Sequence, residues 1–187
     1  MKSGLKSLAV IASLAILTAC GSSKSGGWSR LSADQVDQKS YAIGYSTTAQ
    51  TYLDRVNASY DIDAFMHGAD DWYSNKVTLP VEQIRASLLN RMLDHNVYAY
   101  YSGVLYAAEL QHNFSRLSQT CWTAIQPKSM SQGIHDAMLD LQKTNKPRND
   151  EYIKKGTDDL LHLCVEQVEK EQSAPKKAPK AKKVKHK

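Results

Sequence analysis

Apolar side chains recur at the spacing of an amphipathic helix along most of the chain, and no stretch keeps a strand-like alternation for long. The clearest repeat follows Asp61, a favourable N-cap residue, and predicts a helix that ends at Ser74-Asn75. Its apolar stripe comprises Ile62, Phe65, Met66, Ala69, Trp72 and Tyr73. The hydrophobic pattern therefore predicts an all-α fold.

An earlier helix is expected before this one. Ser32 and Gln35 have the spacing of a capping box, in which the first residue caps a helix and the second reaches back to it. A helix should run from there to about Arg55. Its apolar stripe comprises Tyr45, Ala49, Tyr52, Leu53 and Val56.

The remaining helical repeats lie in the second half of the chain. One repeat covers 80–116, which is long for a globular helix, so it is either one rod or two helices with a break near Asp94-His95-Asn96. Two more helices are expected at about 128–143 and 150–171, separated by a turn at Lys146-Pro147. The whole pattern predicts a helical bundle of about five to six helices.

The first residues have the pattern of an export signal. Lys2 and Lys6 precede an apolar run from Leu8 to Leu17 that is short for a membrane span. The run ends in Leu17-Thr18-Ala19-Cys20, which resembles the lipobox of bacterial lipoproteins. This resemblance implies cleavage after residue 19 and acylation of Cys20 by more than one chain, which durable membrane anchoring requires. The alternative is an ordinary signal peptide with a chance cysteine.

The residues after Cys20 extend this prediction. Gly21 stands where an aspartate favours inner-membrane retention in enterobacteria-like sorting, so the resemblance implies the outer membrane, with the protein on its periplasmic face. Ser22 to Gly27 is rich in glycine and serine, which is typical of a flexible linker. We expect a lipidated tether over 20–31.

Two cysteines remain once Cys20 is acylated. Cys121 and Cys164 form an even pair in a chain that the signal directs to an oxidising compartment, which indicates a disulfide. Cys164 also lies on the inward stripe of the last helix. The alternative is two separate buried thiols.

The net charge of +5 is unevenly distributed. The signal segment and the C-terminal tail carry nine of the lysines, so residues 20–172 alone have a net charge of −4. The tail, 172–187, is rich in proline, alanine and lysine and is expected to be disordered. Its cations are Lys176, Lys177, Lys180, Lys182, Lys183, Lys185 and Lys187. In the envelope they would meet lipid phosphates or peptidoglycan carboxylates rather than nucleic acid, or remain solvated without a partner.

Two family resemblances divide the body into modules over 32–92 and 93–171. Ser40 to Tyr45 (SYAIGY) and Asp61 to Asp71 (DIDAFMHGADD) resemble the N-terminal helical domain of Mip-like FKBP-type periplasmic prolyl isomerases. The resemblance covers about 37–90 and implies a helical scaffold that self-associates. No strand-rich segment follows it, so isomerase activity does not carry over.

The second resemblance covers about 98–164. A Tyr-x-x-Gly helix followed by Cys121 and Cys164 is similar to the Rap/Tai-type immunity proteins, which neutralise amidase toxins in the periplasm. The layout of a small helical lipoprotein with a disulfide is also similar to secretion pilotins. These resemblances imply an inhibitor of a cell-wall amidase, or a pilotin-like secretion accessory.

Catalytic signatures are missing from the sequence. It lacks G-x-S-x-G, a P-loop, a Rossmann glycine fingerprint and H-E-x-x-H, so we expect no enzyme activity, no cofactor and no metal site. Asp94 and His95 are an alternative pair for proton transfer. The aromatic residues Tyr98, Tyr100, Tyr101 and Tyr106 crowd one helical stretch and are candidates for a protein-binding surface, or for a broad core helix.

Three functional hypotheses follow from these patterns. The first is a non-catalytic outer-membrane lipoprotein whose helical body binds another envelope protein or a second copy of itself. The second is a periplasmic immunity or inhibitor protein. The third is an enzyme that uses Asp94 and His95.

Overall fold

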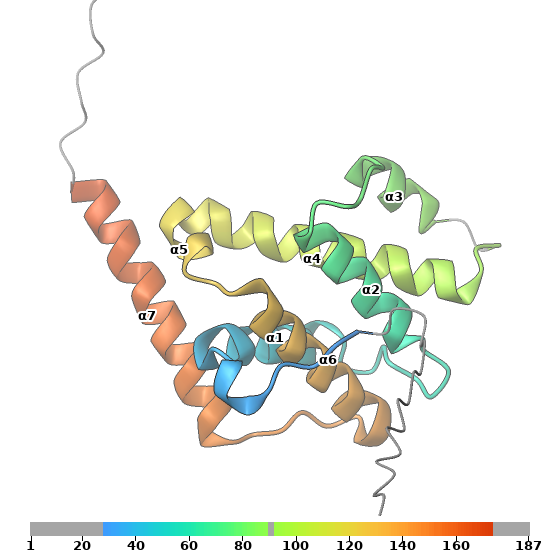
Figure 1. Ribbon diagram of the computed structural model, residues 1–187, viewed down its shortest axis with the longest axis horizontal. Coiled ribbons are helices and arrows are strands. Elements are labelled where there is room, and N and C mark those ends of the chain that lie inside the picture. Colours follow the sequence, from blue (N-terminus) through green and yellow to red (C-terminus); the bar gives the residue numbers. More distant parts are fainter. Residues whose placement is uncertain (1–27, 90–91, 174–187) are drawn as a thin grey trace, which may run out of the picture.

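The computed structural model describes residues 28–89 and 92–173, and every regular element within these ranges is a helix (Figure 1). This confirms the predicted all-α class. The signal segment, Cys20 and the tail lysines lie outside the described residues.

Seven α-helices and one 3₁₀ turn occur in these ranges. In chain order they are η1 (Ala33–Gln35), α1 (Gln38–Thr51), α2 (Ile62–Tyr73), α3 (Val81–Ser87), α4 (His95–Leu117), α5 (Gln119–Thr123), α6 (Pro127–Thr144) and α7 (Glu151–Ser173). The repeat over 80–116 is two helices, α3 and α4, with the break at Asp94 that we considered. The number exceeds the expected five to six because α5 adds a short helix directly after α4.

The start of the first helix differs from the prediction. Ser32 makes no side-chain capping bond and precedes only the 3₁₀ turn. Helix α1 begins instead after Asp37, whose carboxylate accepts a hydrogen bond from the Ser40 backbone N–H at 2.8 Å. Val36 adopts an extended conformation and separates the two elements. The predicted helix therefore begins several residues too early, because a capping-box spacing alone does not continue the helix.

The end of α1 also differs from the prediction. The helix ends at Thr51 rather than near Arg55, and Asp54 follows with a φ of 62°. Leu53, which we assigned to the apolar stripe, is 42% exposed as a result. Asp61 does cap α2 as predicted, since its carboxylate accepts the Ala64 N–H at 2.9 Å.

Two close helix crossings organise the body. At the first, α2 packs on α4, and a Cβ on Gly103 would lie 1.9 Å from the Phe65 carbonyl oxygen. At the second, α1 packs on α6, and a Cβ on Gly44 would lie 2.3 Å from the Met130 carbonyl oxygen. Gly44 therefore serves packing within the chain. Backbones this close leave no space for a side chain at either glycine.

The two predicted modules contribute to one core. Phe65 and Met66 of α2 lie in the same buried cluster as Tyr106 of α4, Ile134 of α6 and Leu160 of α7. Helix α1 also packs against α6 and α7, so helices from both predicted segments lie side by side. Figure 1 shows α1 crossing α6 beneath the α2–α4 pair, with α7 along one side.

The last residues of the expected tether are docked on the body. The Trp28 ring stacks on His135 of α6 at 4.1 Å between centroids, and the Leu31 N–H donates to Gln132 Oε1 at 2.8 Å. Arg30 pairs with Asp136 of the same helix. A tether ending at residue 31 is therefore too long: residues 28–31 are held by α6, because the indole and the guanidinium both find partners there.

A polar network joins α1, α6 and the segment between α6 and α7. The Tyr41 hydroxyl donates to Asp136 Oδ2 at 2.9 Å, and the Tyr45 hydroxyl donates to Asp140 Oδ2 at 2.9 Å. Arg148 connects the two halves, since its Nε donates to Asp140 at 2.7 Å and its terminal nitrogen donates to the Tyr41 oxygen at 2.7 Å. The network fastens the turn around Pro147 against α1.

Asp136 makes stability depend on acid pH. Burial alone would raise the pKa of Asp136, but hydrogen bonds from His135 and Tyr41 and the charge of Arg30 together hold its pKa below its usual range. A depressed folded-state pKa adds stability above the unfolded value of about 4, and this stability is lost as the pH falls through the folded pKa. We expect Asp136→Asn to cost about 1–2 kcal/mol at pH 7 and to flatten the decline below about pH 4.

Urea titrations at a series of pH values check this expectation. Asp158→Asn is the matched control, because this exposed carboxylate forms no ion pair or hydrogen bond within the described residues. An unchanged acid slope in the Asp136 variant would contradict the assigned role.

Candidate functional site

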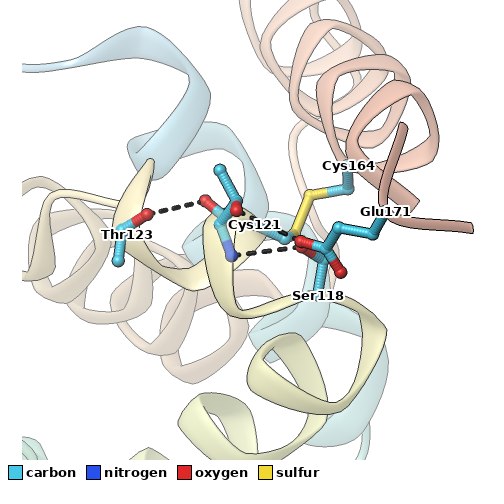
Figure 2. The surroundings of a disulfide bond; sticks show 6 residues. Ser118, Cys121, Thr123, Cys164 and Glu171 are labelled. Atoms are coloured by element: carbon cyan, nitrogen blue, oxygen red, sulfur yellow. Dashed lines mark hydrogen bonds between the residues drawn. A yellow bond between two sulfur atoms is a disulfide. The ribbon is translucent and has the colours of Figure 1, made fainter. Parts of the chain in front are cut away.

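The predicted disulfide is present. Cys121 of α5 and Cys164 of α7 are bonded, with their Cα atoms 4.9 Å apart, and both side chains are buried. Figure 2 shows the bond beside Ser118 and Glu171. The Ser118 hydroxyl donates to the Glu171 carboxylate, so α7 is held to the α4–α5 corner by a covalent and a polar link.

Tyr106 is not a surface residue, which corrects one of the four aromatic candidates. It is 6% exposed, and its hydroxyl is hydrogen-bonded to that of Thr48 at 2.9 Å. Ala99, Gly103 and Leu110 follow the same helical face and are also buried. This face of α4 lies against the core, so Tyr106 belongs to the core.

Tyr100 and Tyr101 are half-buried on another side of α4. The Tyr100 hydroxyl donates to Asp71 Oδ2 of α2 at 3.0 Å. Burial and this hydrogen bond to a carboxylate raise the pKa of Tyr100 to about 12. The two rings lie 5.9 Å apart. Tyr100 thus serves the α2–α4 contact.

Tyr98 is the candidate that remains open to solvent. It is 44% exposed, and its side chain makes no hydrogen bond within the described residues. It lines a pocket of about 350 Å³ where the end of α1, the turn before α2 and the first turns of α4 meet. The lining comprises Tyr52, Arg55, Asn57, Ser59, Tyr60, Asp61, His95, Tyr98, Ala99 and Ser102.

Two aromatic residues of the pocket lining, Tyr52 and Tyr60, pack against rings of the hydrophobic core. The Tyr52 ring meets Phe65 edge-on at 5.3 Å and meets Tyr106 in the same way at 5.3 Å. The Tyr60 ring lies 6.2 Å from Phe65. Phe65 is fully buried in the core, so its packing restricts the positions of the Tyr52 and Tyr60 rings. We therefore expect the pocket to keep its shape before a ligand binds.

Sequence reasoning missed most of this pocket. Tyr52 was assigned to an apolar stripe, and 57–61 is simply a turn in the sequence pattern. The available signal was the proximity of two helix ends on either side of a short turn rich in polar residues and tyrosine. The segment 57–61 becomes part of a concave site only because the first turns of α4 lie against it.

No hydrogen bond joins the side chains of Asp94 and His95 within the described residues. The Asp94 carboxylate accepts the Asn96 N–H at 2.9 Å and caps α4, while His95 lines the pocket with an exposed side chain. Within 28–89 and 92–173, no three His, Cys, Asp or Glu side chains are grouped so as to hold a metal ion. In the same ranges no helix combines the length and apolar character needed to cross a bilayer.

Comparisons with known proteins bear on the envelope prediction. A family model described as "Uncharacterised lipoprotein" matches residues 34–166. A Haemophilus influenzae protein, described as an uncharacterized protein, is 49% identical over 136 residues, which is 72% of this chain and 76% of that protein. No solved structure matches the chain significantly. The matches support a bacterial lipoprotein, and they support neither the prolyl isomerase nor the immunity-protein resemblance.

Proposed function

Because this chain belongs to the lipoprotein family whose model it matches over 34–166, we propose that it is a non-catalytic lipoprotein that binds another protein in the cell envelope. Acyl chains on Cys20 would anchor it, and Gly21 favours the outer membrane, with the helical body in the periplasm. The proposal joins a membrane anchor to a recognition surface.

The observation that carries the binding role is the exposed ring of Tyr98 in the lining of this pocket. An exposed tyrosine offers a large amphipathic surface at low entropic cost, and such residues are enriched where proteins bind one another. Its hydroxyl has no partner within the described residues, and its ring is not part of the core cluster. Tyr98 is therefore available to a partner without unfolding of the body.

Site-specific photocrosslinking in intact cells tests this proposal. A photoreactive amino acid replaces Tyr98 in the full-length chain, and adducts are identified by mass. The control places the same amino acid at Asn113, an exposed position elsewhere on α4 whose side chain makes no hydrogen bond within the described residues.

The expected result is a discrete protein adduct at 98 and none at 113. An adduct of twice the chain's mass would identify the partner as a second copy. Equal, diffuse labelling at both positions would contradict a binding surface at Tyr98.

A further inference from the structure

The polar groups of the Tyr98 pocket divide into those in use and those left free. Within the described residues, the Arg55 guanidinium, the His95 ring and the Tyr98 hydroxyl form no hydrogen bond or ion pair. The Tyr60 hydroxyl is buried and makes no hydrogen bond of normal geometry within the described residues, although the neighbouring Ser102 side chain lowers its pKa against the effect of burial. All four groups can donate a hydrogen bond, and a buried donor without a partner is costly.

The acceptors of the pocket are already occupied. The Asp61 carboxylate accepts the Ala64 N–H and the Asn96 amide, both at 2.9 Å. The Asn57 side-chain oxygen accepts the backbone N–H and the hydroxyl of Ser59, at 3.0 and 2.8 Å. The side chains of the pocket therefore offer several free hydrogen-bond donors and few free acceptors. This suits an anionic ligand, which is rich in acceptors.

The charge balance agrees with this reading. Arg55 is a fixed cation whose fork of N–H groups matches a carboxylate in bidentate geometry. The nearby negative charge of Asp61 is directed at the N-terminus of α2, which it caps and whose dipole it complements. The uncommitted charge on the pocket wall is therefore the positive charge of Arg55.

The rest of the lining favours a ligand that carries an apolar group beside its anionic group. The rings of Tyr52, Tyr60 and Tyr98 supply apolar surface beside these donors. A volume of about 350 Å³ is typical of a small-ligand site and too small for a folded surface. The last one or two residues of a peptide would fit this volume, and they combine an apolar side chain with a terminal carboxylate.

We infer that this pocket binds the C-terminal carboxylate of a partner protein, with the apolar side chain of the last residue against the three tyrosine rings. Arg55 pairs with the carboxylate, and the Tyr60 hydroxyl donates the hydrogen bond that it lacks in the free protein. This inference rests on the proposed function and specifies how the partner is recognised.

Calorimetric titration of the full-length protein in detergent micelles tests it. The probes are N-acetyl-Ala-Ala-Phe with a free carboxylate and the same peptide with a C-terminal amide. Loss of a charge-assisted pair should weaken binding of the amide at least about 10-fold. Arg55→Gln should weaken binding of the acid by a similar factor and abolish the difference between the two peptides.

Two further variants separate recognition from folding. Tyr60→Phe keeps the ring and removes the hydroxyl, and should weaken binding of the free-carboxylate peptide about 3-fold or more. Arg116→Gln, at an exposed arginine on α4 with no ion pair within the described residues, should change nothing. Thermal unfolding of each variant verifies that the body is intact.

Several outcomes overturn the inference. They are equal binding of acid and amide, full binding by the Arg55 variant, and tighter binding of N-acetyl-Ala-D-Ala-D-Ala, which would assign the site to cell-wall stem peptides instead. A crosslinked partner at Tyr98 without carboxylate discrimination removes this inference and leaves the proposed function standing. Carboxylate discrimination without any crosslinked protein would leave a carboxylate site in the pocket but would overturn its assignment to a partner protein, and the proposed function with it.

Discussion

Replacing both Cys121 and Cys164 by alanine is expected to lower the free energy of unfolding by about 4 kcal/mol. The two cysteines are 43 residues apart, and opening a loop of this length restores that much chain entropy to the unfolded state. Both side chains are buried, so the lost sulfur atoms add a smaller packing cost.

Urea unfolding of the full-length wild-type protein and of the double alanine variant measures this difference. Amide hydrogen exchange locates it: α5 and the second half of α7 should lose protection first, because without the disulfide the described residues join the end of α7 to the α4–α5 corner through hydrogen bonds to Glu171. A stability loss below about 1 kcal/mol, or a loss of protection centred on α2, would show that the staple is not what holds α7.

Gly103→Ala is expected to destabilise the protein by about 1–3 kcal/mol or more, although alanine is the better helix former by about 1 kcal/mol. The added Cβ would lie 1.9 Å from the Phe65 carbonyl oxygen, a backbone atom that cannot rotate away. Helices α2 and α4 would have to separate. Gly68, where a Cβ would lie 2.0 Å from the Tyr100 carbonyl oxygen, faces the same crossing from α2.

Thermal unfolding compares this variant with Asn113→Ala on the exposed side of α4. The control should be neutral or slightly stabilising, because alanine there gains helix propensity without a contact. A melting temperature for Gly103→Ala at or above that of the wild type would mean that the α2–α4 crossing is looser than the structure shows.

Local helical pattern was sufficient for several elements. The repeat after Asp61 predicted α2 with its cap and its end, and the repeats near 128–143 and 150–171 predicted α6 and α7 closely. In these segments the cap or turn residue and the apolar stripe agree, so the helix needs little help from the rest of the fold.

Other features were decided by contacts between distant residues. Ser32 and Asp37 are both reasonable caps, and the choice of Asp37 coincides with contacts to α6, where the Asp37 N–H donates to Ser129 Oγ at 3.0 Å. Tyr98 and Tyr106 are both tyrosines on one helix, and their exposure differs because α1 and α2 cover only one face of α4. A sequence pattern does not specify which neighbour covers a face.

The sequence by itself determined the helical class and the pairing of Cys121 with Cys164, because each depends on local spacing or on simple counting, and the lipobox at Cys20 stays a prediction of the same kind. Only the tertiary structure decided that glycines would pair α2 with α4 and α1 with α6, that residues 28–31 would dock on α6, and that Arg55 and Tyr60 would meet Tyr98 in one pocket. The physical reason is that helical periodicity defines an apolar face, whereas close backbone approach and complementary side chains select the helix that covers it.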